Sequence, residues 1–199
     1  QTVNFSVPVT RPNGDGPFPG ILSLGGTTPD NVAVLNIRNA SNQFASAGGG
    51  RATTGAFYTL FPDYTSTGSL MAWAWMASRI VDALVATTGH GIDSSKLSAL
   101  GCSRDGKEAA TIALFDDRFA MVAAQSPGSA TTSGWRVAQE VLNGGGNVQT
   151  AAQIFGENTW MGAVFQPFGN QNVSRLPIDQ HEVLALAWPR PLIMMEGTN

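Results

Sequence analysis

The chain has 199 residues, of which 43% are hydrophobic and only 13% are charged, and its formal net charge is −3. This composition excludes a disordered chain, and the absence of any run of Lys and Arg excludes a nucleic-acid-binding face that neutralises phosphates. No stretch of about 18 residues is free of polar residues, so we expect no membrane-spanning segment. The length predicts one domain over residues 1–199.

Apolar runs in the first half of the chain predict three strands and one helix. Residues 3–9 alternate like a half-exposed strand. Residues 20–24 and 32–37 are continuous apolar runs, typical of strands buried on both faces of a parallel sheet. Residues 41–66 show no clear periodicity and predict a long loop. Residues 69–86 have apolar side chains at helical spacing and predict the clearest helix of the chain.

In the second half, predicted strands alternate with predicted helices. The strands are 96–100, 119–124 and 191–195, and the helices are 108–115, 135–142 and 178–188. This alternation predicts right-handed crossovers and a mainly parallel sheet covered by helices on both faces. In such a sheet, functional groups gather at the carboxyl ends of the strands, and every candidate residue named below lies at or just after such an end.

A sharp turn is predicted where the strand at 96–100 meets the following helix. Its sequence, GCSRDGK over residues 101–107, places Ser103 at a helix N-terminus, where the dipole favours developing negative charge. Gly101 and Gly106 supply the small neighbours that close packing needs. In the usual nucleophile elbow, G-x-S-x-G, the second glycine stands one residue earlier. A serine that only caps the helix is the alternative.

The sequence LGCSRDGK over residues 100–107 resembles the G-C-S-R-N-G-K-G-A signature of the glucuronoyl methylesterases, carbohydrate esterase family 15. Asp105 stands where the family has Asn, and Glu108 where it has Gly. Five further segments are similar to the family's and follow its order: GSLMAWAW at 68–75, WR at 135–136, NVQTAAQI at 147–154, EN at 157–158 and PR at 189–190. The resemblance is specific because it extends over residues 20–196.

The resemblance implies an α/β-hydrolase fold, a three-layer sandwich with a mainly parallel central sheet. It also implies a serine-type carboxylic ester hydrolase that cleaves esters of 4-O-methyl-glucuronic acid on glucuronoxylan, as in lignin–carbohydrate ester links. No cofactor is expected. No metal is expected either, because the sequence has only two isolated histidines and no spaced Cys/His cluster.

By the same resemblance, Ser103 is the nucleophile and Arg104 supports the oxyanion with its backbone amide and its guanidinium. A delocalised, permanently charged donor suits a tetrahedral oxyanion. Lys107, Gln149 and Glu157 correspond to the sugar-binding residues of the family. Lys107 lies one helical turn after Ser103 and therefore on the same face. Taken alone, Lys107 and Glu157 would be read as solvated surface residues.

A serine hydrolase also needs a base, and usually a carboxylate that orients it. Many family members place the acid after the strand that follows the elbow helix, but this position is Ser126 here. Other members take the acid from the end of a later strand, where this chain has Glu196, and we expect Glu196 to be the acid. The alternative is a strand-terminal glutamate that bonds the following turn.

The base is not evident among the two histidines. His90 precedes the strand that leads to Ser103, at the opposite edge of the sheet from the elbow, and His181 lies in a helical stretch. In the family the catalytic histidine lies further on, in a His-Cys pair whose cysteine bridges to the position that Cys102 occupies. The resemblance therefore implies a catalytic histidine beyond Asn199, in a longer catalytic domain.

Two other functions stay open. The departures at Asp105, Glu108 and Ser126 allow another carbohydrate esterase, such as an acetyl xylan esterase. If no base is available, a catalytically inactive carbohydrate-binding relative is the better interpretation.

The few lysines and the glycosylation sequons at Asn4, Asn39 and Asn172 indicate a secreted, extracellular protein. We expect a monomer whose partner is the glucuronoxylan ester substrate, with neither nucleic acid nor a membrane as a partner.

Overall fold

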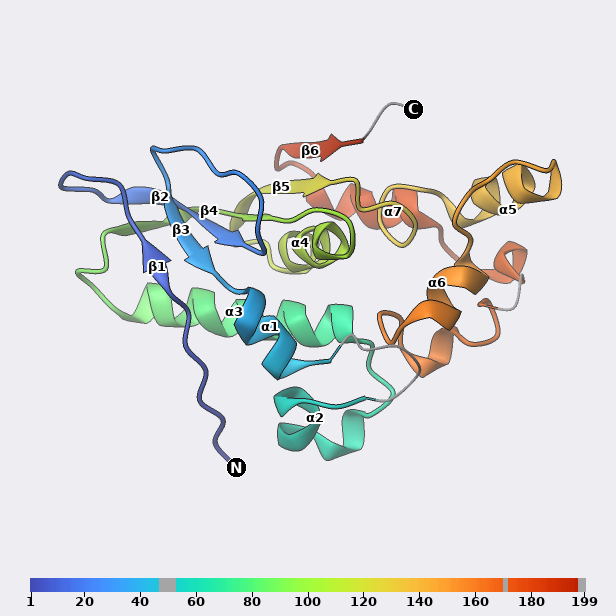
Figure 1. The fold of residues 1–199 in the computed structure, drawn as a ribbon, viewed down its shortest axis with the longest axis horizontal. Coiled ribbons are helices and arrows are strands. Elements are labelled where there is room, and N and C mark those ends of the chain that lie inside the picture. The colour runs from blue at the N-terminus through green and yellow to red at the C-terminus, as the bar shows by residue number, and fades with distance from the viewer. Residues whose placement is uncertain (47–52, 170–171, 197–199) are drawn as a thin grey trace.

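The computed structural model describes residues 1–46, 53–169 and 172–196. Within them, six strands form one sheet in the order β1-β3-β2-β4-β5-β6 (Figure 1). β1 pairs with β3 in antiparallel fashion, and all other neighbours are parallel, so the mainly parallel sheet predicted from the sequence is confirmed. The strands are β1 (Val9–Thr10), β2 (Phe18–Ser23), β3 (Ala33–Asn36), β4 (Ile92–Leu100), β5 (Phe119–Gln125) and β6 (Leu192–Met195).

The N-terminal strand is much shorter than its alternating sequence predicts. Only Val9 and Thr10 pair with β3, so the strand predicted at 3–9 is wrong except at its last residue. β3 is itself only four residues long and offers little to pair with. Phe5 and Val7 instead pack, partly buried, against the core. The alternation of apolar and polar residues before Val9 therefore arises because one side of this segment packs on the core, although the segment is not part of the sheet.

The long helices lie where the sequence predicts them. α3 (Ser69–Ala86) has the predicted bounds, while α4 (Arg104–Phe115) begins directly after Ser103 and α5 (Trp135–Asn143) extends one residue further than predicted. The helix predicted at 178–188 is divided into α7 (Gln180–Leu184) and a 3₁₀ turn. α6 (Ala151–Glu157) was not predicted. The 3₁₀ turns of this half are Ala163–Phe165, Val173–Arg175 and Ala185–Ala187.

The segment predicted as one long loop contains short helices. α1 (Arg38–Phe44) ends in it, and α2 (Ala56–Leu60) and the 3₁₀ turn Pro62–Tyr64 follow. The loop prediction is therefore wrong for the described part of 41–66, and residues 47–52 lie outside the described residues. Helices this short carry no readable period. Aromatic packing holds them: Phe44 stacks on Trp75 of α3 with ring centroids 5.5 Å apart.

α3 and α4 lie side by side against one face of the sheet (Figure 1). By length and composition alone, α3 is apolar enough to cross a membrane. No segment of this kind was expected from the sequence, so the criterion for a membrane-spanning segment was too strict. Half of this helix is buried in the structure, and its buried side chains, among them Trp73 and Met76, belong to the hydrophobic core.

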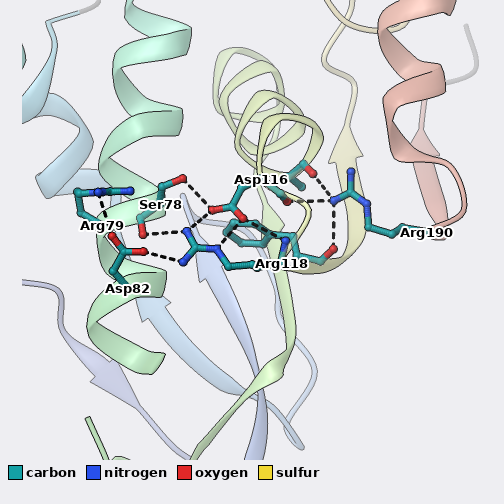
Figure 2. Close-up of polar contacts among 8 residues, drawn as sticks. Ser78, Arg79, Asp82, Asp116, Arg118 and Arg190 are labelled. Atoms are coloured by element: carbon teal, nitrogen blue, oxygen red, sulfur yellow. Dashed lines mark hydrogen bonds and ion pairs between the residues drawn. The ribbon is translucent and has the colours of Figure 1, made fainter. Parts of the chain in front are cut away.

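A polar network fixes the C-terminal end of α4 to the elements around it (Figure 2). The Arg118 guanidinium forms ion pairs of 2.6 Å with Asp116, just after α4, and with Asp82 of α3. The Ser78 hydroxyl of α3 donates to Asp116 Oδ2 (2.7 Å), the same oxygen that pairs with Arg118. The guanidinium of Arg190, before β6, donates to the carbonyl oxygens of Ala113, Asp116 and Phe119. The helix that starts at Ser103 is thereby held at its far end.

Candidate active site

Ser103 lies at the sharp turn between β4 and α4. Its φ of 59° and ψ of −125° form a combination that residues other than glycine rarely adopt. The Ser103 N–H donates to the carbonyl of Gln125 on β5 (3.0 Å), and its own carbonyl accepts from the N–H of Lys107 (3.0 Å). The neighbouring strand and the first turn of α4 therefore hold the turn from both sides, and the Ser103 side chain remains exposed.

Two glycines make this turn possible. A Cβ atom on Gly101 would lie 2.3 Å from the Asp105 carbonyl oxygen, and one on Gly106 would lie 2.6 Å from the Gln125 carbonyl oxygen. Both contacts are with backbone and cannot be relieved by turning a side chain. Gly106 thus has the function that the second glycine has in the usual elbow pattern, although it stands one position later.

The Ser103 side chain does not cap α4, which removes the alternative of a simple helix cap. The amide of Arg104, at the first position of the helix, has no acceptor within the helix and can donate to an oxyanion beside Ser103. The exposed Arg104 side chain lines a cavity of about 350 Å³ together with Arg38 of α1. No described residue holds its guanidinium by a hydrogen bond, so the role of this group stays a prediction.

Lys107 is buried, unlike the solvated lysine that its residue type alone would suggest; its relative exposure is 4%. Its Nζ donates to the carbonyl oxygens of Pro127 and Ser129, the latter at 2.7 Å, and lies 5.4 Å from the centroid of the Trp160 ring. Burial lowers the pKa of Lys107 to about 8, while the carboxylates of Glu157 and Glu196 act against this fall. Lys107 therefore lies within electrostatic reach of both carboxylates.

Gln149 and Glu157 flank α6, one before its first residue and the other at its last. The Gln149 amide donates to Glu157 Oε2 (3.0 Å), and both side chains line a cavity of about 590 Å³ beside the helix. A Cβ atom on Gly128 would lie 3.7 Å from Lys107 Nζ and 3.8 Å from Gln149 Oε1. The three residues expected to bind a sugar therefore come together around the loop that follows β5.

Glu196 follows β6, two strands away from the strand that carries Ser103. Its Oε1 accepts a hydrogen bond from the Thr132 hydroxyl (2.8 Å). The backbone of Ser126 lies beside this strand end, because its N–H donates to the Met195 carbonyl (2.6 Å). The two positions from which an acid is expected, 126 and 196, are thus neighbours in space, and a carboxylate at either would lie at the same edge of the sheet.

Neither histidine makes a hydrogen bond to Ser103 in the described structure. His90 precedes β4 at the strand end remote from Ser103, roughly 25 to 30 Å away along the strand. Its ring nitrogens contact the Leu84 carbonyl (2.9 Å) and the Ile92 N–H (3.1 Å), so it holds the local turn. His181 is exposed on α7, and its ring makes no hydrogen bond to any residue that the structure describes.

The two departures from the expected signature have partners on α1. Asp105 forms an ion pair with Arg38. Glu108 is 2% exposed and lies 2.5 Å from the Ser41 hydroxyl. Burial raises the pKa of Glu108 to about 8, with Asp105 adding to the rise and the Ser41 hydrogen bond and Arg38 opposing it. These residues join α4 to α1 beside the elbow and do not enter the cavity beside α6.

Four residues around the site were not identified from the sequence: Gly128, Ser129, Thr132 and Trp160. For Gly128, Ser129 and Thr132 the available signal was the loop between β5 and α5, which is rich in Gly, Ser and Thr; Trp160 follows α6 and had no such signal. Gly128 has a φ of +61°, a conformation that glycine adopts without strain. Cys102, next to Ser103, is an exposed free thiol in the described structure.

The whole chain, residues 1–199, matches a family model described as glucuronyl esterase, fungi. It is 39% identical to a 4-O-methyl-glucuronoyl methylesterase from Thermothelomyces thermophilus, over 99% of this chain and 50% of the relative. It is 40% identical to one from Neurospora crassa, over 99% of this chain and 51% of the relative. The chain thus spans about half the length of the curated relatives it matches.

Solved structures with the same fold include two of direct interest. The glucuronoyl esterase catalytic domain from Hypocrea jecorina superposes with a TM-score of 0.92 at 34% identity, over 99% of this chain and 55% of that chain. A serine-to-alanine variant of the glucuronoyl esterase from Sporotrichum thermophile, in complex with methyl 4-O-methyl-beta-D-glucopyranuronate, superposes with a TM-score of 0.91 at 36% identity. This match covers 98% of this chain and 54% of that chain.

Proposed function

Because this chain belongs to the fungal glucuronyl esterase family and has its α/β-hydrolase fold, we propose that the protein that contains it hydrolyses esters of 4-O-methyl-glucuronic acid on glucuronoxylan. The observation that carries this proposal is the strained, exposed Ser103 at the N-terminus of α4, on the same helix face as the buried Lys107. The complex of a Sporotrichum thermophile relative with a methyl glucuronate ester supports the substrate class.

The proposed reaction has two steps. The Ser103 hydroxyl oxygen attacks the ester carbonyl carbon, the bond to the alcohol oxygen breaks, and the alcohol leaves with the proton from Ser103. Water then cleaves the glucuronoyl–serine ester. The Arg104 amide and guanidinium stabilise the oxyanion in both steps. Glu196 orients the histidine expected beyond Asn199, which carries the proton between Ser103, the alcohol and water.

On the acyl side, Lys107, Gln149 and Glu157 bind the sugar ring. Their grouping around Gly128 supplies a cation, an amide and a carboxylate, which suit a polyol that both donates and accepts hydrogen bonds. None of the relatives described above favours an acetyl ester as the substrate or an inactive carbohydrate-binding role. We also propose that the protein is secreted and monomeric; the low lysine content and the three sequons support secretion.

A substrate comparison tests the proposed function. The full-length protein is assayed with methyl 4-O-methyl-glucuronate, with the matching methyl glucose ether that lacks an ester, and with acetylated xylan. We expect release of methanol from the glucuronate ester alone. Release of acetate at a comparable kcat/KM, or no turnover of the glucuronate ester, would refute the proposed specificity.

A further inference from the structure

The cavity of about 350 Å³ that Arg104 lines lies beside the elbow, between α1 and α4. Its lining includes four side chains that can carry a charge, namely Arg38 of α1 and Arg104, Asp105 and Glu108 of α4. None of the residues proposed to bind the sugar lines this cavity. Arg104 is the one lining residue that also belongs to the proposed ester site.

The two arginines of this cavity differ in their partners. The Arg38 guanidinium forms an ion pair with Asp105. The Arg104 guanidinium has no hydrogen bond or ion pair with any residue that the structure describes, although it lines the same cavity. A guanidinium is permanently charged, so the charge of Arg104 is available to a ligand, whereas that of Arg38 is engaged by Asp105.

The Arg38 guanidinium lies at the edge of the sheet that carries Ser103. Gly25 follows β2, the strand next to β4, and a Cβ atom on Gly25 would lie 2.7 Å from Arg38 Nη2. This nitrogen is also the atom that binds Asp105 Oδ2. A side chain at position 25 would therefore displace the guanidinium, and the glycine leaves room for the ion pair between α1 and α4.

An unpaired carboxylate at position 105 would oppose the proposed chemistry. Asp105 is the second residue of α4 and follows Arg104 directly. Its negative charge would attract the Arg104 guanidinium and would repel the negative charge that develops beside Ser103. Burial raises the pKa of Glu108, in the same cavity, to about 8, so that this group is mainly protonated near neutral pH. Asp105 is therefore the carboxylate whose charge has to be neutralised.

We propose that Arg38 is a positioning residue for ester hydrolysis: by holding the Asp105 carboxylate, it keeps the Arg104 guanidinium free to stabilise the oxyanion. This inference rests on the proposed function. Exposed ion pairs contribute little to stability, and the Arg38 side chain is 49% exposed, so stability alone does not account for the pair. Removal of Arg38 should be harmful only while residue 105 carries a negative charge.

The experiment compares kcat and KM of the native full-length protein and three variants on methyl 4-O-methyl-glucuronate. Arg38→Gln should lower kcat by about 10- to 100-fold, somewhat less than the loss of an oxyanion donor itself, with little change in KM. Asp105→Asn removes the negative charge and should have a kcat no lower than the native value. The double variant Arg38→Gln/Asp105→Asn should therefore regain most of the lost kcat, as expected for two coupled residues.

Further measurements separate this role from a structural one. Arg38→Gln and Asp105→Asn break the same ion pair, so a purely structural role would lower the melting temperature and kcat of both variants equally. Arg38→Lys keeps the positive charge and should retain more of the native kcat than Arg38→Gln does. Arg79→Gln breaks another exposed ion pair, that with Asp82 on α3 (3.0 Å), and should have the native kcat.

The outcomes distinguish this inference from the proposed function. A native kcat in Arg38→Gln, equal losses in the two single variants, or a loss that persists in the double variant would overturn the role of Arg38 and leave the proposed function intact. If the native protein does not cleave the ester, the proposed function is refuted and the role of Arg38 with it.

Discussion

Lys107 carries its charge in an environment that only partly stabilises it. Two backbone carbonyls accept from its Nζ and two carboxylates lie within electrostatic reach, yet burial still lowers its pKa to about 8. A lysine is a cation below its pKa. If a charged Lys107 binds the sugar, this interaction is complete below about pH 8 and is lost as the pH rises through that value.

We therefore predict that kcat/KM for a glucuronate ester falls above about pH 8, since this ratio reports the pKa values of the free enzyme. Lys107→Met should lower kcat/KM at pH 7 by about 10- to 100-fold, the contribution of one hydrogen bond to a charged group. It should also remove the decline above pH 8. Lys96→Met changes the only other lysine of the chain, which is exposed, and should leave the profile unaltered. An unchanged profile in Lys107→Met would refute this role.

The Glu108 carboxyl group is buried beside the Ser41 hydroxyl, and burial shifts its pKa upward, in the opposite direction to that of Lys107. Its pKa is raised from an ordinary value of 4.5 to about 8, mainly by burial. The folded protein thus keeps this proton over a range in which the unfolded chain releases it. The contribution of Glu108 to stability is therefore complete below pH 4.5 and is lost as the pH rises toward 8.

The prediction is a decrease of roughly 1 kcal/mol in the free energy of unfolding per pH unit over this range, attributable to Glu108. Glu108→Gln has the same shape and no proton to lose, so it should remove this component. Urea unfolding of the full-length protein at pH 5 and pH 7.5 measures the difference. Glu140→Gln, at an exposed glutamate of α5, should retain the native pH dependence. Identical pH dependence in Glu108→Gln would contradict the account of this residue.

At the scale of elements, α4 is the helix on which the site depends, and it is fixed at both ends. Its N-terminus is held through the elbow, and its C-terminus is bonded by Arg190, which donates to the Ala113, Asp116 and Phe119 carbonyls. The Ala113 carbonyl lies in the last turn of α4, where carbonyls lack intrahelical donors, and Asp116 directly follows the helix, whereas Phe119 is the first residue of β5. Figure 2 shows Arg190 approaching them from the segment that leads into β6.

Arg190→Ala should therefore destabilise the protein by roughly 2 to 4 kcal/mol, because several carbonyls lose a charged donor at once. Differential scanning calorimetry should show a melting temperature roughly 5 °C lower or more. Arg175→Ala is the matched control, because Arg175 is exposed and its guanidinium makes no such bonds to any described residue. A melting temperature equal to that of the control would show that the Arg190 bonds do not stabilise α4.

The elements that the sequence predicted well are those with many residues in one pattern. α3 has eighteen residues and was located to the residue, and the apolar runs of β2, β3, β5 and β6 were located nearly as well. α1 and α2 have only seven and five residues, too few for a period, and their packing through Phe44 depends on distant residues. α6 was missed although Thr150 and Gln153 form a capping box at its start.

In the candidate site, too, the features set by neighbouring residues could be predicted and those set by distant residues could not. Ser103, Gly101 and Gly106 are adjacent in the sequence, and their geometry follows from local sterics, so the elbow could be predicted. The bond from Thr132 to Glu196 joins residues 64 positions apart, and the Trp160 ring below Lys107 belongs to another segment altogether. Such contacts are set by the tertiary fold and leave no pattern in the sequence. The roles of Arg104, Gln149 and Glu157 in catalysis remain predictions.

At the scale of the whole molecule, the parallel sheet explains why these residues meet. Ser103 follows β4, the loop containing Gly128 and Thr132 follows β5, and Glu196 follows β6, and these three strands are consecutive neighbours in the sheet. Their carboxyl ends therefore share one edge. α6 lies beyond this edge (Figure 1), with Gln149 just before its first residue and Glu157 at its last. The residues proposed as nucleophile, acid and sugar-binding group are brought to one edge of the sheet by topology, although they are far apart along the chain.

The most direct measurement asks whether Ser103 is the nucleophile. The full-length protein is treated with one equivalent of a phosphonate that reacts with activated serines, and the modified residue is located by peptide mass spectrometry while esterase activity is followed. We predict that the label is on Ser103 and that activity falls in proportion to labelling. Ser103→Ala should take up no label and should lose activity by on the order of 10⁵-fold. Loss of activity with the label on another residue, or full labelling of Ser103 with activity retained, would contradict the account.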